Sequence, residues 1–245
     1  MIFAAGLGTR LKPLTDTMPK ALVPVAGKPL LAHVIEKLRQ AEFTHIVINV
    51  HHFADQIIDY VQASHQFGID IRISDEREQL LETGGGIKKA APLFDVSKPI
   101  LIHNVDILSN LDLADIYNKV GENDALLVVS ERNTSRYLLF NEIQHLVGWT
   151  NISTGERRGP ICDNPQTTVL RLAFSGIHVI GPRLLKRMNS YPERFPIIDF
   201  YLNECSSASI QAFVPSNLKM MDVGKLDTLH EADAFSQELN KQALL

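Results

Sequence analysis

Cysteine is scarce in this chain of 245 residues, which contains only Cys162 and Cys205. The two form no CxxC pair and no metal-ligand spacing, so the sequence indicates neither a disulfide framework nor a zinc site and favours a reducing cytoplasm. Long apolar runs are also missing: LLVV at 126–129 is typical, whereas a bilayer span needs about 20 apolar residues. No basic segment followed by a long apolar one opens the chain. We therefore expect a cytoplasmic protein without a membrane partner.

An excess of one charge is absent too. The chain has 24 Lys and Arg against 28 Asp and Glu residues, a net charge of −4, which does not favour nucleic acid or an anionic membrane surface as a partner. Any polyanionic ligand must therefore be held by cations gathered at one place. A chain of this length should bury roughly 70 to 75% of its unfolded surface, so a substantial core is available.

Short β-rich runs alternate with amphipathic helices, which predicts an α/β fold with a mostly parallel central sheet. The expected strands are 2–5, 44–50, 69–74, 99–106, 125–130 and 170–180. The expected helices include 29–41, 54–64, 87–94, 112–120 and 226–242. Between the expected strands 125–130 and 170–180, the runs YLLFN and HLVGW indicate a β-rich segment, which an exposed turn cluster over 151–166 follows. No repeat or linker divides the chain, so we expect one domain over 1–245.

The stretch AAGLGTRLKPLTDTMPK, directly after the first expected strand, combines glycines with cations. Gly6 and Gly8 can offer unobstructed backbone N–H groups to phosphate, although a GxG can also be a plain connecting turn. Leu11 breaks the GxGxxG spacing, and GxxxxGK[ST] does not occur. Arg10 and Lys20 bracket two prolines that stiffen the loop, and two such cations suit a triphosphate. Lys12 and Lys28 are interpreted as solvated surface residues.

The whole stretch resembles the signature of the sugar-phosphate nucleotidyltransferases. The resemblance continues in order through LLETGGGIKKA (80–90), LIHNVDI (101–107), FSGIHVI (174–180) and MDVGKLDTL (221–229). It implies a Rossmann-like, glycosyltransferase-A-type three-layer sandwich, with a nucleotide-binding half over 1–130 and a sugar-phosphate-binding half over 131–245. LETGGG and FSGI are most similar to short members that act on N-acetylmuramate 1-phosphate, in cell-wall recycling, or on mannose 1-phosphate.

The resemblance also assigns residues. It implies that Arg10 and Lys20 are catalytic and that Asp106 and Asp222 bind Mg²⁺. The sugar phosphate falls to Gly176 and Asp199. The residues assigned to the nucleotide are Ala4, Ala5, Gly6, Gly8, Thr9, Gly84, Gly85 and Asn104, and among these Gly84 and Gly85 would meet the base.

Several of these residues also have a purely structural interpretation from the neighbouring sequence. Thr83–Gly86 can be only a cap region before a helix, and Asp106 can be an Asx turn at a strand end. A carboxylate such as Asp199 commonly lies on the exposed face of a helix. His51 and His52 suggest a metal site, but adjacent residues on a strand point opposite ways, so we expect no ligand role.

The chain departs from the family pattern in three places. Val105 stands where relatives carry glycine before the metal-binding Asp. The lysine that binds the sugar phosphate in relatives is missing, since no Lys occurs between 140 and 172, and Arg157, Arg158 or Arg171 are its candidate replacements. Relatives also carry more residues before the first strand, which suggests a start further upstream or a frayed first strand.

The implied reaction joins a nucleoside triphosphate to a sugar 1-phosphate, with Mg²⁺ as cofactor and pyrophosphate as second product. UTP is the preferred nucleotide, with an N-acetylmuramate-like or hexose 1-phosphate, and GTP with mannose 1-phosphate is the alternative. A catalytically idle nucleotide sensor, or transfer to a non-sugar phosphate such as choline phosphate, are further alternatives. The sequence is compatible with a monomer or a homodimer.

Overall fold

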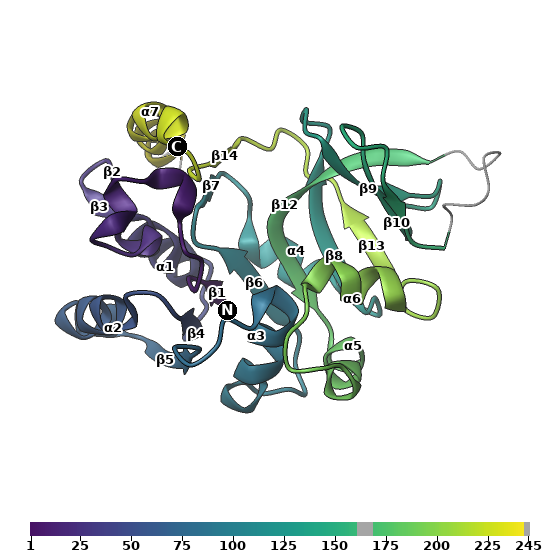
Figure 1. Ribbon diagram of the computed structural model, residues 1–245, viewed down its shortest axis with the longest axis horizontal. Coiled ribbons are helices and arrows are strands. Elements are labelled where there is room, and N and C mark those ends of the chain that lie inside the picture. Colours follow the sequence, from purple (N-terminus) through teal and green to yellow (C-terminus); the bar gives the residue numbers. More distant parts are fainter. Residues whose placement is uncertain (161–168, 243–245) are drawn as a thin grey trace. The chain divides into compact units, whose positions relative to one another are not determined.

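The structure, a computed structural model, describes residues 1–160 and 169–242, so residues 161–166 of the predicted turn cluster and Cys162 lie outside it (Figure 1). The chain forms two compact units that are interleaved in sequence. Unit 1 comprises Met1–Leu80, His103–Ala114 and Asn217–Leu245, and unit 2 comprises Leu81–Ile102 and Asp115–Ser216. These units do not follow the predicted division at residue 130.

Unit 1 is built on parallel strands. Their order is β6 (Ile100–Asn104, whose last two residues belong to this unit), β1 (Ile2–Phe3), β4 (His45–Val50) and β5 (Asp70–Asp75). Two antiparallel ribbons accompany them: β2 (Pro24–Val25) with β3 (Lys28–Pro29), and β7 (Ile107–Ser109) with β14 (Met220–Asp222). The helices are α1 (Leu30–Gln40), α2 (Ala54–Ala63) and α7 (Leu226–Gln242).

Apolar patterning explains these elements. β4 reads HIVINV and is buried from Ile46 onward, as expected of a parallel strand covered on both faces. The apolar stripe of α1, including Val34, Ile35 and Leu38, is at most 2% exposed. Ile2 lies in register with Ile48 on one side and His103 on the other, so β1 is short but paired on both sides rather than frayed. These strands position the loop that follows β1.

Unit 2 holds the β-rich excursion. Its strand order is β11 (Arg157–Arg158), β10 (Leu146–Asn151), β9 (Arg136–Phe140), β12 (Leu170–Ile180), β8 (Ala125–Ser130) and β13 (Ile210–Phe213). Only β8 and β13 are parallel among these pairs of described strands. Its helices are α3 (Glu82–Ala90), α5 (Pro182–Arg187) and α6 (Ile197–Glu204), and α4 (Leu113–Lys119) begins in unit 1 and continues into unit 2.

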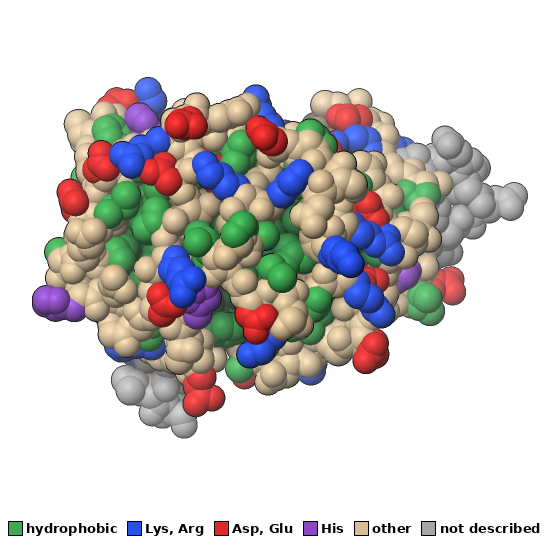
Figure 2. Space-filling view, turned by 90° about the horizontal axis from the view of Figure 1, so that it is seen from below, with side chains coloured by type: hydrophobic (Ala, Val, Ile, Leu, Met, Phe, Trp, Pro, Cys, Tyr) green, Lys and Arg blue, Asp and Glu red, His purple; other side chains and the backbone are tan. Residues whose placement is uncertain are grey.

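The predicted α/β class with a parallel sheet is confirmed, and strands 125–130 and 170–180 and helix 226–242 match β8, β12 and α7. The prediction of a helix over 87–94 is wrong at its start, because α3 begins at Glu82 and ends at Ala90. None of the described helices combines the length and apolarity that a membrane span requires. On the face drawn in Figure 2, the described basic and acidic side chains are interspersed, in keeping with the balanced composition.

Candidate functional site

The loop after β1 is fixed to the neighbouring strand at its first residue. The buried N–H of Ala4 donates to Oδ1 of Asn49 on β4 at 2.8 Å, and Nδ2 of Asn49 donates to Oε1 of the fully buried Glu76 at 2.7 Å. Ala5, next in the chain, is buried as well. The N–H of Ala4 is therefore engaged within the protein, so a nucleotide contact at Ala4 must use other atoms. Nucleotide contacts at Ala4 and Ala5 both stay predictions.

Gly8 turns the loop back on itself. Its φ of 64° is left-handed, and its carbonyl accepts hydrogen bonds from the Leu11 N–H and the Thr15 hydroxyl, both at 2.9 Å. A Cβ added at Gly8 would lie 3.0 Å from Cβ of Lys20 and 3.0 Å from Cγ2 of Thr15. Glycine is needed here for both conformation and space, and it brings the turn onto the stem of Lys20. Gly6 and Thr9 are exposed on the same loop.

The two predicted metal carboxylates lie beside each other at the β7–β14 ribbon of unit 1. Asp106 precedes β7, and Asp222 is the last residue of β14, in register with Ile107 of β7. The carbonyl of Asp106 accepts a hydrogen bond from the N–H of Val223 at 2.8 Å. The antiparallel β7–β14 ribbon thus brings together two carboxylates that lie more than a hundred residues apart in the sequence.

Both predicted catalytic cations reach the same place. The Lys20 ammonium is hydrogen-bonded to Oδ2 of Asp106, and both side chains are largely buried. A Cβ added at the buried Gly224 would lie 2.5 Å from Oδ1 of Asp222, 2.7 Å from Nη2 of Arg10 and 3.2 Å from Nζ of Lys20. Arg10, Lys20 and Asp222 therefore converge around a glycine that leaves them room, and Asp106 joins them through its hydrogen bond with Lys20. These four residues are called the charged cluster below.

The charged cluster has oxygen donors but few of them. Among residues 1–160 and 169–242, the structure holds no group of three or more His, Cys, Asp and Glu side chains that could bind a metal. Two carboxylates without nitrogen or sulfur partners suit a hard cation that takes its other ligands from water and phosphate. The formal charges of the two cations and two carboxylates cancel, so the cluster alone attracts a polyanion only weakly.

Histidines near these strands are engaged in structural roles. His103 on β6 is fully buried, its Nδ1 lies 2.8 Å from the carbonyl of Asn104, and its Nε2 has no hydrogen-bond partner. Burial lowers the pKa of His103 to about 4, so its ring is neutral at physiological pH. His51 Nδ1 lies 2.7 Å from the carbonyl of Glu76. Asn104, the predicted nucleotide contact, is half-buried at the end of β6.

The three glycines of the LETGGG block lie inside α3, in unit 2. The N–H groups of Gly84 and Gly85 both donate to the carbonyl of Phe195, at 2.9 and 3.1 Å. A Cβ at Gly84 would lie 2.3 Å from the Phe195 ring, and one at Gly85 would lie 2.1 Å from the Glu193 carbonyl. The close approach that these glycines permit is to the segment before α6. Contact with a nucleotide base stays a prediction, and it would require atoms other than these two N–H groups.

The predicted sugar-phosphate residues also belong to unit 2. Gly176 is buried on β12 with a φ of 74°, where the register with β8 shifts. Asp199 on α6 accepts a hydrogen bond from Nη1 of Arg158 at 2.5 Å, and the Arg158 guanidinium lies over the Trp149 ring, 4.1 Å from its centroid. The carboxylate of Asp199 is therefore partly engaged by an arginine rather than free on a helix face.

Sequence reasoning missed some residues that shape the site. Gly224 stands inside the MDVGK block and carried a readable signal, since a glycine beside a functional carboxylate suggests close approach. Thr15 and Asn49 carried none, because one is an isolated hydroxyl in a loop and the other an isolated amide in an apolar strand. Their importance follows only from the hydrogen bonds that the fold creates.

Comparison with known proteins agrees with this arrangement. A model of the family described as "Nucleotidyl transferase" matches residues 1–138. The chain is 49% identical over 108 residues to the N-acetylmuramate alpha-1-phosphate uridylyltransferase of Caulobacter vibrioides, a match covering 43% of this chain and 44% of that protein. The enzyme of the same name from Neisseria meningitidis serogroup B is 46% identical over 112 residues, covering 46% and 48%. Both matches thus span less than half of these relatives.

Solved structures match over almost the whole chain. HddC from Yersinia pseudotuberculosis, in complex with GMP-PN, has a TM-score of 0.77 at 22% identity, covering 96% of this chain and 97% of that one. An apo UDP-glucose pyrophosphorylase has a TM-score of 0.74 at 18% identity, covering 97% of both chains. At these identities the likeness shows the fold, which is the Rossmann-like arrangement that the sequence predicted.

Proposed function

Because the chain belongs to the nucleotidyl transferase family, we propose that it transfers a nucleotidyl group from a nucleoside triphosphate to a sugar 1-phosphate and releases pyrophosphate. The observation that carries this proposal is the convergence of two cations and two carboxylates around Gly224. UTP and N-acetylmuramate 1-phosphate are the first substrates to consider, since the relatives that are 49% and 46% identical bear that activity in their names.

The proposed reaction requires positive groups that offset the charges of two phosphate-bearing substrates, and it requires no general base. An oxygen of the sugar phosphate attacks the α-phosphorus, and the bond from that phosphorus to the pyrophosphate oxygen breaks, so the leaving group departs with the electron pair. A phosphate monoester has its second pKa near ~6, so the attacking oxygen is already ionised at neutral pH. The obstacle is the approach of two polyanions, and preorganised positive groups lower it.

Arg10 and Lys20 have distinct tasks in this proposal. Arg10 is exposed on the loop, and its fork of donors can follow charge onto the departing pyrophosphate. The stem of Lys20 lies near Gly8, and its ammonium is suited to the α-phosphate or the sugar phosphate as a compact point charge. Without substrate, the carboxylate of Asp106 holds the Lys20 ammonium at the site.

Mg²⁺ is the proposed cofactor, held by Asp106 and Asp222. The donor set fits, because Mg²⁺ commonly takes one or two carboxylates and completes its shell with water and substrate phosphates. When bound, it would supply positive charge that the electrically balanced cluster lacks. The residues themselves keep their places through the hydrogen bond from Val223 to Asp106 and the β7–β14 pairing.

Arg158 is the proposed replacement for the missing sugar-phosphate lysine. Of the three candidates, Arg157 and Arg171 are exposed, whereas Arg158 is half-buried, paired with Asp199 and stacked on Trp149. Nη1 of Arg158 donates to Asp199, and its Nε lies 3.5 Å from Oε1 of Glu156, an ion pair without hydrogen-bond geometry. A guanidinium that is oriented by its neighbours can present its remaining donors to an anionic ligand.

The decisive experiment is a panel of the four nucleoside triphosphates against several sugar 1-phosphates with Mg²⁺, monitored by pyrophosphate release. We expect the highest turnover with UTP and N-acetylmuramate 1-phosphate. Arg10→Ala should then lower kcat on the order of 10² to 10³-fold, as expected for removal of one preorganised donor. Pyrophosphate release with choline phosphate, but with none of the sugar 1-phosphates, would show that the acceptor is a non-sugar phosphate. No pyrophosphate release with any pair of substrates would contradict the proposal.

A further inference from the structure

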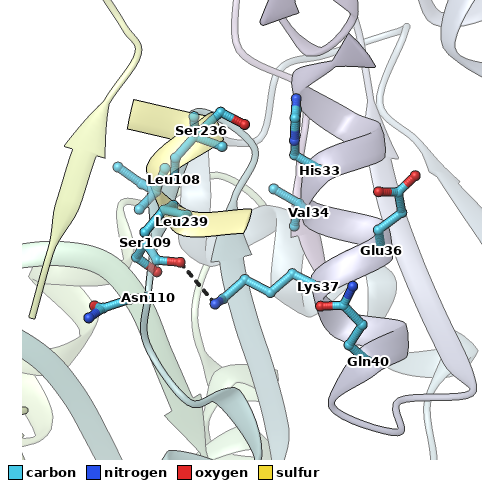
Figure 3. Close-up of a pocket in the computed structure, with 11 residues that line it drawn as sticks. His33, Val34, Glu36, Lys37, Gln40, Leu108, Ser109, Asn110, Ser236 and Leu239 are labelled. Carbon is cyan, nitrogen blue, oxygen red and sulfur yellow. Dashed lines mark hydrogen bonds between the residues drawn. The ribbon is translucent and has the colours of Figure 1, made fainter. Parts of the chain in front are cut away.

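A cavity lies within unit 1, among α1, β7 and α7, and no residue of the charged cluster lines it. Its volume is about 360 Å³, which falls in the range of about 300 to 1,000 Å³ typical of small-molecule sites. Figure 3 shows Lys37 of α1 reaching across it toward Ser109 of β7, with Ser236 and Leu239 of α7 on a further wall. The reaction proposed above gives this cavity no role.

Lys37 is the group that defines the chemistry of the cavity. Its ammonium donates to the carbonyl of Ser109 at 2.9 Å, which uses one of its three N–H donors. Burial lowers the pKa of Lys37 to about 8, and the negative charge of Asp112 opposes part of that shift. The amine is therefore still mostly protonated at neutral pH, although it is poorly solvated, and an anion would stabilise it.

The other ionisable groups near Lys37 do not neutralise it. Glu36 on the same helix forms an ion pair with Lys28 at 2.7 Å, and in Figure 3 its carboxylate points away from the Lys37 amine. His33 Nε2 lies 2.8 Å from the carbonyl of Val25. Asp112 attracts the ammonium at longer range, and the buried ring of His103 is neutral at physiological pH because its pKa is lowered to about 4.

The remaining walls are mixed in character. Val34, Ile107 and Leu108 are at most 5% exposed and present apolar surface. Gln40, Asn110, Ser109 and Ser236 add amide and hydroxyl groups to the lining. Lys37 faces an apolar wall with neutral polar groups at the sides, and the lining carboxylate of Glu36 is paired with Lys28 and turned away from it. This arrangement matches a ligand with one negative head and a short apolar body.

We propose that this cavity is a binding site for a small organic anion, whose carboxylate-like head pairs with the Lys37 ammonium and whose apolar body lies against Val34 and Leu108. The inference does not rest on the transferase activity, because every residue that carries it lies in unit 1 outside the charged cluster. It is therefore tested by direct binding rather than by turnover.

The test is isothermal titration calorimetry of the full chain at pH 7 with benzoate, with benzamide as its neutral isostere, and with inorganic phosphate. We expect benzoate to bind at least about tenfold more tightly than benzamide, as a hydrogen bond to a charged group implies. Lys37→Met should lower benzoate affinity by about tenfold or more. Lys89→Met, which changes an exposed lysine on α3, should leave it unchanged. Leu239→Trp narrows the cavity without touching the amine and should also weaken binding.

Each contrary result overturns the proposal. Equal affinity for benzoate and benzamide would remove the role of charge, and unchanged affinity in Lys37→Met would place the probe elsewhere. Binding of phosphate but not benzoate would remove the apolar part of the ligand. If Lys37→Met does not fold, Leu239→Trp carries the test, and unchanged benzoate affinity in that variant would exclude this cavity.

Discussion

Gly224→Ala is the substitution whose effect the geometry defines best. The new Cβ would lie 2.5 Å from Oδ1 of Asp222, 2.7 Å from Nη2 of Arg10 and 3.2 Å from Nζ of Lys20. Ordinary contact begins near 3.4 Å, so the carboxylate and guanidinium must each retreat by roughly 1 Å. These atoms are the ends of flexible side chains and can move. The substitution should therefore displace side chains of the charged cluster and leave the backbone in place.

A displacement of about 1 Å in a catalytic constellation can lower turnover by about 10²-fold. We expect that loss in kcat for pyrophosphate release by Gly224→Ala, with a melting temperature within a few degrees of the wild type.

Gly85→Ala is the contrasting variant. Its Cβ would lie 2.1 Å from the backbone carbonyl of Glu193, which cannot swing aside, so thermal unfolding should reveal clear destabilisation. Full turnover of folded Gly224→Ala would refute the view that this glycine makes room for the charged cluster.

The remaining predictions concern the metal ligand Asp106, the proposed sugar-phosphate residue Arg158 and the stability of the protein in acid. Asp106→Asn should abolish Mg²⁺-supported turnover while circular dichroism stays native, and an unchanged Mg²⁺ titration curve would remove Asp106 from the metal site. Arg158→Ala should raise KM for the sugar phosphate by about tenfold or more through loss of a charged hydrogen bond, whereas exposed Arg157→Ala should not, and equal effects would contradict the assignment. Burial lowers the pKa of His103 to about 4 and of His178 to about 3, so both rings stay neutral in the fold below pH 6.5 while the unfolded chain gains protons. Urea unfolding should show stability falling from pH 6.5 to pH 5 by about 2 kcal/mol for each ring, and a flat profile would contradict their burial as neutral groups.

The parts of the fold that sequence alone predicts are those set by local pattern. ALLVVS and LRLAFSGIHVI form β8 and β12 with the expected bounds, because short runs rich in apolar residues that include Val or Ile favour buried strands. The start of α3 could not be predicted. Three glycines disfavour a helix by propensity, yet the chain around Phe195 packs against them at a distance that no side chain would allow.

The candidate site divides in the same way. Arg10 and Lys20 could be singled out from one short segment of mixed glycine, proline and cations. The partnership of Asp106 with Asp222 could not follow from spacing, because it depends on the pairing of two three-residue strands far apart in the sequence. Arg158 could not be separated from Arg157 by sequence, since only the fold turns one toward Asp199 and leaves the other in solvent.

The β7–β14 ribbon has a consequence for biosynthesis. Asp222 reaches Asp106 only after residues 220–224 have left the ribosome and added a strand to a segment made much earlier. The other strands of unit 1 precede β14 in the sequence and are free to pair before that moment. The nascent unit 1 is therefore able to form most of its sheet while it still lacks Asp222, one of the two proposed metal ligands. A chain that terminates before Met220 would lack β14 and Asp222, so it would be able to fold in part without competence for the phosphate chemistry proposed here.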